Sequence, residues 1–254
     1  MKYLAKIAYI GTNFCGFQVQ PGKRTVMGTL SDCLTQMLGQ TPKITGCSRT
    51  DSGVHALGFC VTIECPIATI PADKLPLASI PYLPPDLSIL SAILVEDTFH
   101  VRYDVENKTY VYRIYNSRVP HPMEYNRSWF LPHIIKEEDF MRMCRGSKAF
   151  LGTHDFSAFM SEGSDVTDTV RTIHSIEVEK SEDIISIRIC ADGFLYNMVR
   201  IIVGTLVEFA LSRNGISDIS EIILSKKRDN AGMTAPPEGL YLETVVYKNG
   251  FSFK

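Results

Sequence analysis

The order of strand-like and helix-like segments in the first hundred residues limits the possible folds more than any other feature. Alternating or continuous apolar runs predict strands, and apolar residues at i, i+4 and i+7 predict helices. The order that results is β-α-β-β-α-β, which is the split βαβ pattern. The six predicted segments are strand Lys2–Ile10, helix Thr25–Leu38 ending at Gly39, strands Lys43–Cys47 and Ala56–Glu64, short helix Pro71–Ile80, and strand Ser88–Val95.

The second half of the chain repeats the mixed α/β theme without a repeat at the level of letters. We therefore expect an α+β protein of two halves, residues 1–104 and 105–254. The predicted segments of the second half are strand Asn107–Tyr115, helix Glu137–Ala149, the hairpin Thr172–Lys180 with Ile184–Ala191, helices Phe194–Leu211 and Ser217–Leu224, and strand Leu240–Tyr247.

The segment Phe194–Leu211 is apolar on nearly every side and is the longest such stretch. Because it also contains Asn197, Arg200 and Glu208, a buried helix of a soluble protein fits better than a membrane span. A buried guanidinium needs a partner. Arg200 can pair with Glu208 or with backbone carbonyls, or else with an active-site carboxylate. Gly204, on the same polar stripe, would allow another segment to approach closely.

A turn-forming segment between two predicted strands, Gly46–Ala56, offers the best candidate for chemistry. Asp-Ser-Gly favours a turn, so Asp51 should lie on an exposed loop held by rigid strands. Arg49 precedes it by two residues and His55 follows it by four. The alternative is an ordinary tight turn in which Asp51 binds its own backbone. For Tyr110, in a predicted strand, the alternatives are a half-buried amphipathic side chain and a ligand contact.

Composition and charge narrow the function classes. Seven cysteines without a CxxC pair fit scattered thiols in a reducing cytosol better than a zinc or disulfide framework. The N-terminus lacks the apolar core of a signal peptide. A net charge of −2 is unusual for a nucleic-acid enzyme, although local basic surface is what binds phosphates. The candidates for such a surface are Lys23, Arg24, Arg102, Lys108, Arg113, Arg118, Lys226, Lys227 and Arg228.

Other motifs fail on inspection. The segment Gly11–Gly16 has P-loop spacing without the following Gly-Lys-Ser/Thr. His154-Asp155 has no second metal-ligating cluster at suitable spacing. A GxSxG nucleophile elbow does not occur.

Five stretches, in order along the chain, resemble the bacterial tRNA pseudouridine synthase A family over nearly the whole length. They are Gly11–Gln20; Arg49–Ala56; Phe99–Arg102 with Lys108–Tyr110; Phe150–Phe159; and Gly193–Gly204 with Thr234–Leu242. Six positions depart from the family pattern. Phe17 stands where tryptophan is common and Phe59 where glutamine is common; the others are Ile10 for aspartate, Val101 and Asp104 for alanine, and Asp192 for asparagine.

The resemblance implies two ferredoxin-like α/β halves whose mixed and antiparallel sheets join around a central cleft, the pseudouridine synthase fold. It implies a cytoplasmic homodimer, no membrane association, and a tRNA that touches both subunits. The expected reaction isomerises uridine to pseudouridine in the anticodon stem-loop, at tRNA positions 38–40, without a metal or organic cofactor. Asp51 matches the catalytic aspartate; the substrate-binding matches are Tyr110, Arg49, Arg200, Leu240 and His55.

Two other functions remain open at this stage. One is a non-catalytic RNA-binding module or chaperone descended from such an enzyme. The other is a carboxylate hydrolase that uses Asp51 and His55, although no second acidic partner has clear spacing.

Overall fold

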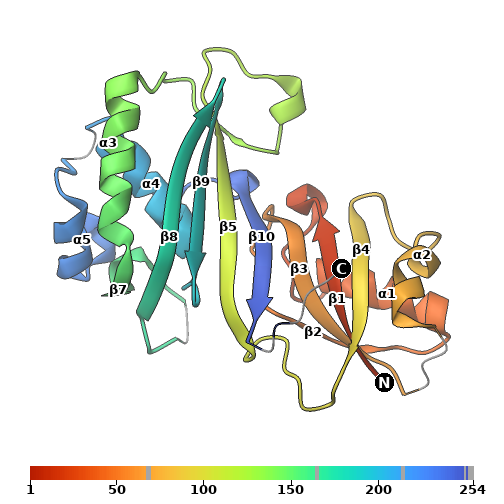
Figure 1. The fold of residues 1–254 in the computed structure, drawn as a ribbon. Helices are drawn as coiled ribbons and strands as arrows, with labels where there is room; N and C mark the ends of the chain where they lie inside the picture. Colours follow the sequence, from red (N-terminus) through yellow and green to blue (C-terminus); the bar gives the residue numbers. More distant parts are fainter. Residues whose placement is uncertain (67–69, 164–165, 213–214, 249, 251–254) are drawn as a thin grey trace. The chain divides into compact units, whose positions relative to one another are not determined.

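The computed structural model describes residues 1–66, 70–163, 166–212, 215–248 and 250. The chain forms two compact units (Figure 1). Unit 1 comprises Met1–Glu106 and Tyr241–Lys254, and unit 2 comprises Asn107–Leu240. The sequence had divided the chain once, after residue 104. The structure divides it after Glu106 and returns the last strand to unit 1.

Unit 1 contains the predicted β-α-β-β-α-β order. Its sheet has the strand order β4-β1-β3, and both β2 and β10 pair with β3. The order β4-β1-β3-β2 is that of the ferredoxin-like motif, as predicted. The elements are β1 (Lys2–Tyr9), α1 (Val26–Leu38), β2 (Lys43–Gly46), β3 (His55–Glu64), α2 (Leu75–Ser79), β4 (Leu87–Val95) and β10 (Leu240–Tyr247), with 3₁₀ turns η1 (Gly11–Asn13) and η2 (Ala72–Lys74).

Helix α1 shows how local sequence sets these elements. Thr25 caps its N-terminus, because the Thr25 hydroxyl accepts a hydrogen bond from the Gly28 N–H at 3.2 Å. The apolar positions Leu30 and Leu34 face inward. Gly39 ends the helix in the left-handed conformation, with φ of 70°, as predicted.

Unit 2 has the strand order β5-β9-β8-β7, and β6 pairs with β5 in parallel. Helices α3 and α4 contact each other, and α3 also contacts β8 (Figure 1). The elements are β5 (Val105–Tyr115), β6 (Trp129–Phe130), α3 (Glu137–Ser147), β7 (Gly152–Asp155), β8 (Val170–Ser181), β9 (Ile184–Ala191), α4 (Met198–Ala210) and α5 (Ile219–Ser225). Its 3₁₀ turns are η3 (Pro122–Glu124), η4 (Lys148–Phe150), η5 (Ser157–Phe159), η6 (Arg228–Asn230) and η7 (Pro237–Gly239).

The predicted long helix begins four residues later than expected. Asn197 adopts the left-handed conformation, with φ of 61°, so a regular helix cannot continue through it. Helix α4 therefore starts at Met198, and it is buried within unit 2, as predicted. Within the described residues, no helix is both long and apolar enough to cross a membrane. The short strands β6 and β7 were not predicted, because two and four residues give too little alternation to recognise.

Candidate functional site

The Asp51 loop connects β2 to β3, as predicted, and is clamped by the segment that follows β1. The Phe17 N–H donates to the Thr50 carbonyl at 3.1 Å. The hydroxyls of Tyr9 and Thr50 are 2.8 Å apart. Because Tyr9 and Thr50 are both buried and Asp51 is half-buried, the loop holds the carboxylate at a fixed place near the surface of unit 1.

Two glycines allow this close approach. A Cβ on Gly11 would lie 2.0 Å from the Val54 carbonyl oxygen, and one on Gly16 would lie 2.7 Å from the Thr50 carbonyl oxygen. Gly16 also has a φ of 81°, which favours glycine. The first stretch of the family resemblance, Gly11–Gln20, thus packs directly on the second, which contains Asp51.

His55 is a core side chain of unit 1. It is 1% exposed, and its ring stacks on Tyr241 with centroids 4.6 Å apart. Its Nδ1 accepts a hydrogen bond from the Gly11 N–H at 3.0 Å. His55 therefore fixes Gly11, which belongs to the segment that packs on the Asp51 loop. This buried, structural position argues against a hydrolase in which His55 activates water. Its predicted contact with substrate stays a prediction.

Arg49 is exposed on the same loop. Beneath the loop, the rings of Phe17 and Phe59 stack with centroids 4.4 Å apart. These are two positions at which the sequence departs from the family pattern, and they contact each other. The two departures therefore form one packing unit, and Tyr9 packs against the same Phe59 ring at 5.8 Å.

In unit 2, Arg200 on α4 is held by neighbours on two sides. Its Nε donates to the Ala235 carbonyl at 2.7 Å, and its Nη1 donates to Asn197 Oδ1 at 2.7 Å. The Ala235 N–H in turn donates to the Arg200 carbonyl at 3.0 Å. The two parts of the fifth stretch of the family resemblance are therefore in contact.

The segment that carries Ala235 packs along the polar stripe of α4. A Cβ on Gly204 would lie 1.8 Å from the Met233 carbonyl oxygen, which confirms the predicted close approach. Glu208, 8% exposed, accepts the Met233 N–H through Oε1 at 3.2 Å, and Thr205 Oγ1 accepts the Gly232 N–H at 2.9 Å. The carboxylate of Glu208 thus binds the segment that Arg200 also binds.

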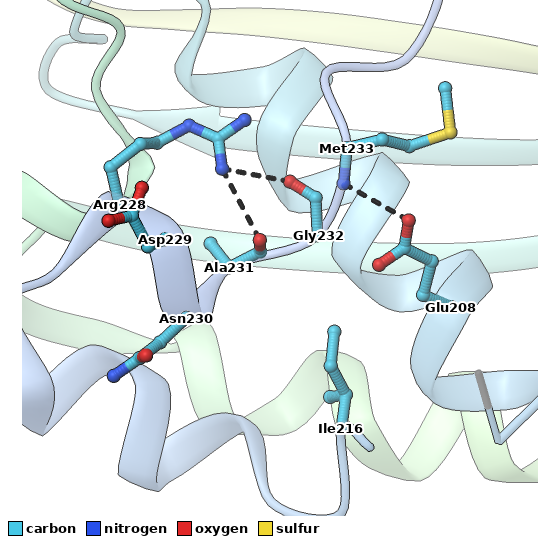
Figure 2. A pocket seen from close by; sticks show the side chains of 8 residues that line it. All are labelled: Glu208, Ile216, Arg228, Asp229, Asn230, Ala231, Gly232 and Met233. Atoms are coloured by element: carbon cyan, nitrogen blue, oxygen red, sulfur yellow. Dashed lines mark hydrogen bonds between the residues drawn. The ribbon is translucent and has the colours of Figure 1, made fainter. Parts of the chain in front are cut away.

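A cavity of about 360 Å³ is lined by this segment together with Glu208 and Arg228 (Figure 2). Figure 2 shows Arg228 pointing at the backbone, where its Nη1 donates to the Ala231 carbonyl at 3.3 Å and to the Gly232 carbonyl at 2.9 Å. Arg228 therefore fixes the chain in place, and the sequence's suggestion of a phosphate contact there finds no support. Within the described residues, no group of three or more His, Cys, Asp or Glu side chains could hold a metal ion.

Tyr110 and Leu240 are buried in unit 2, at 6% exposure each. The Tyr110 ring meets Phe194 edge to face, with centroids 4.9 Å apart. The neighbouring Tyr112 hydroxyl donates to the Pro236 carbonyl at 2.7 Å, a contact that the sequence analysis missed because a strand tyrosine shows no partner in its pattern. Burial raises the pKa of Tyr112 well above its ordinary value, and the charge of Glu238 adds to this.

Three of the predicted basic side chains are paired with acidic side chains at the protein surface. Arg24 forms a two-pronged ion pair with Asp86 at 2.8 Å, which lowers the pKa of Asp86. Lys226 Nζ lies 2.9 Å from Asp155 Oδ2. Arg113 Nη2 lies 3.2 Å from Glu124 Oε1. These charges are largely neutralised within the protein.

Comparison with known proteins identifies the family of the chain. A family model described as tRNA pseudouridine synthase matches residues 5–104 and 147–248. The tRNA pseudouridine synthase A of Thermoanaerobacter sp. (strain X514) is 42% identical over 241 residues, 95% of this chain and 97% of the relative. The corresponding protein of Bacillus licheniformis is 41% identical over 251 residues, 98% of this chain and 100% of the relative. The chain belongs to the tRNA pseudouridine synthase family.

Two further similarities are of the same kind or weaker. The "tRNA pseudouridine synthase A 2" of Clostridium tetani is 43% identical over 244 residues, 95% of this chain and 97% of the relative. Among solved structures, a Cbf5-Nop10-Gar1 complex overlaps with a TM-score of 0.41 at 12% identity, covering 94% of this chain and 48% of that one. That overlap is too small to add to the family assignment.

Proposed function

We propose that this protein isomerises uridine to pseudouridine in the anticodon stem-loop of tRNA. The observation that carries the proposal is the similarity of 41–43% over nearly the full length to relatives named tRNA pseudouridine synthase A. The aligned region covers both units, and it therefore includes the predicted site residues of unit 1 and those of unit 2.

Asp51 is the proposed catalytic residue. The reaction breaks the bond between C1′ of the ribose and N1 of the uracil, and it forms a bond between C1′ and C5. The proton on C5 is lost and N1 gains one, so the product is an isomer. Positive charge develops at C1′ when the first bond breaks, and a carboxylate can stabilise that charge or attack covalently. The clamped loop supports this role, because it fixes a half-buried carboxylate without burying it fully.

The other predicted residues have supporting roles in the proposal. A paired uridine must leave its helix before an enzyme can reach it, and the exposed Arg49 is proposed to fill the vacated space. Tyr110 is proposed to form an aromatic wall that holds the detached uracil. Arg200 is proposed to pair with the catalytic carboxylate, with Leu240 lining the base pocket and His55 holding the loop.

The proposal also covers the cofactor requirement, the cellular location and the oligomeric state. The proposed reaction requires no metal or organic cofactor, because it breaks one bond and forms another within the same nucleotide without a change in oxidation state. The proposed protein is a cytoplasmic homodimer in which one tRNA touches both subunits.

Mapping of pseudouridine in tRNA tests the proposal. We expect tRNA from cells that lack this protein to lose pseudouridine in the anticodon stem-loop, and a plasmid copy of the gene to restore it. A copy that carries Asp51→Asn should fail to restore it. Unchanged pseudouridine in the deletion strain, with no second homologue present, would refute the proposal and favour the non-catalytic RNA-binding alternative.

A further inference from the structure

The segment between β5 and β6 presents large apolar side chains to solvent. Val119 is 69% exposed, Met123 is 78% exposed and Tyr125 is 76% exposed. Single exposed apolar residues are common on protein surfaces, but three large ones within seven residues of one segment make this segment a candidate binding surface. None of the three belongs to the predicted site.

This segment has a defined conformation. His121 caps the turn η3, because its Nδ1 accepts the Met123 N–H at 3.2 Å. The Glu124 N–H donates to the His121 carbonyl at 3.0 Å, and the Tyr125 N–H donates to the Pro122 carbonyl at 3.2 Å. The backbone that carries the exposed side chains is therefore ordered before any partner binds, which lowers the backbone entropy lost on binding.

The base of the segment is fixed as well. The buried side chain of Asn116 donates through Nδ2 to the Leu131 carbonyl at 3.0 Å and to the His133 carbonyl at 2.9 Å. Its Oδ1 accepts the Ile135 N–H at 2.9 Å. Asn116 thus ties the two ends of the segment together.

The charge around these side chains favours an anion. Arg118 and Arg127 are exposed on the same segment. Its one acidic residue, Glu124, is paired with Arg113 at 3.2 Å. The segment's own residues are therefore net positive on a chain whose net charge is −2. Glu182 and Asp183 of the turn between β8 and β9 lie beside its base, where the Asn116 N–H donates to the Asp183 carbonyl at 2.7 Å. Aromatic and apolar side chains interleaved with arginine are typical of surfaces that bind single-stranded or looped RNA.

The segment also continues from the proposed site within unit 2. Strand β5 carries Tyr110 and runs to Tyr115, where the segment begins. Five residues of a strand span about 17 Å. An RNA stem-loop with one base at Tyr110 is large enough to extend along β5 to this segment.

We propose that Arg118, Val119, Met123, Tyr125 and Arg127, the basic apolar surface, bind tRNA outside the reacting nucleotide. The Tyr125 ring and the Met123 side chain pack against a base or ribose, and Arg118 binds a phosphate. The proposal rests on the proposed function for the identity of the RNA. A protein partner, including a second copy of this chain, is the competing occupant.

Direct binding measurements test this surface. We expect Met123→Ser with Tyr125→Ala to raise the Kd for unmodified tRNA about tenfold. Arg118→Gln should lower the slope of log Kd against log salt by about one. The matched control is Met141→Ala with Leu224→Ala, which removes side chains that are 46% and 79% exposed on helices of the same unit. The control should bind like the wild type, and thermal melting confirms that each variant folds.

The outcomes separate this inference from the proposed function. The Kd is measured without turnover, so a wild-type protein that binds tRNA but makes no pseudouridine refutes only the proposed function. An active wild type whose surface variants bind tRNA like the control refutes only this inference. The inference also requires that Met123→Ser with Tyr125→Ala sediment like the wild type. A change in sedimentation would assign the surface to a second copy and overturn the inference whatever the tRNA affinity, because the proposed tRNA touches both subunits.

Discussion

The two units hold their predicted site residues by different means. In unit 1 the Asp51 loop is held by backbone contacts and by rings, with Phe17 stacked on Phe59 beneath it. In unit 2 Arg200 is held by polar contacts, to Ala235 and Asn197. Asp51 and Arg200 are both half-buried. A guanidinium that is partly withdrawn from water needs partners for its donors, and Ala235 and Asn197 supply two of them.

The two units share one feature: in each, a glycine allows two backbone segments to approach closely. Gly204→Ala places a methyl group where the Met233 carbonyl lies, and Gly11→Ala does the same at the Val54 carbonyl. Overpacking of this kind costs about 1–3 kcal/mol, and we expect the upper end of that range at both sites. Urea unfolding measures the loss. Gln36→Ala, at an exposed position of α1, is the control and should change stability by less than about 0.5 kcal/mol.

The glycine pair also distinguishes the two units. Gly11→Ala displaces the loop that carries Asp51, so turnover should fall by more than the loss of folded protein explains. Equal stability of Gly204→Ala and the wild type would show that the segment at Met233 moves freely, and the account of unit 2 would then be wrong.

Glu208 gives a smaller effect that is specific to the polar arrangement. Glu208→Leu leaves the Met233 N–H without its acceptor, which should cost about 1–2 kcal/mol. Glu208→Gln retains an acceptor oxygen and should lose less than half as much. Chemical denaturation compares the two. If both variants lose the same stability, packing and not the hydrogen bond holds the segment.

Asp155 gives the smallest effect, and it depends on pH. A hydrogen bond from Thr169 and the ion pair with Lys226 lower the pKa of Asp155. A carboxylate with a lowered pKa in the folded state contributes stability above its unfolded pKa, near 3.9, and that contribution is lost as the pH falls toward the folded pKa. Asp155→Asn should therefore cost about 1 kcal/mol at pH 7, because exposure screens the pair.

The pH dependence supplies the test for Asp155. The difference in unfolding free energy between the wild type and Asp155→Asn should shrink as the pH falls below about 4. A difference that stays constant between pH 7 and pH 3 would show that the charge of Asp155 contributes nothing.

Local sequence predicted much of this fold. The end of α1 at Gly39, the order of helices and strands along unit 1 and the close approach at Gly204 all follow from patterns within a few residues. The start of α4 was missed, because the left-handed conformation of Asn197 depends on its surroundings and not on helical periodicity.

The site was predicted less completely than the fold. The turn at Asp51 was predicted from local sequence, and its catalytic role stays a prediction from the family resemblance. The contacts that hold this loop, from Tyr9 to Thr50 and from Gly11 to His55, join residues some forty positions apart. The same holds for Tyr112 and Pro236, whose hydrogen bond spans 124 positions. Such contacts leave no periodic signal in one sequence, since each partner alone is an ordinary strand or loop residue.

Tritium release tests the central claim, that Asp51 performs the isomerisation, most directly. Transfer RNA labelled with tritium at uracil C5 is incubated with the wild type and with Asp51→Asn, which keeps the shape of the side chain and removes its charge. We expect the wild type to release tritium, and Asp51→Asn to bind tRNA with a similar Kd and release none above background. Appreciable release by a folded Asp51→Asn variant would contradict the assignment of Asp51 as the catalytic residue.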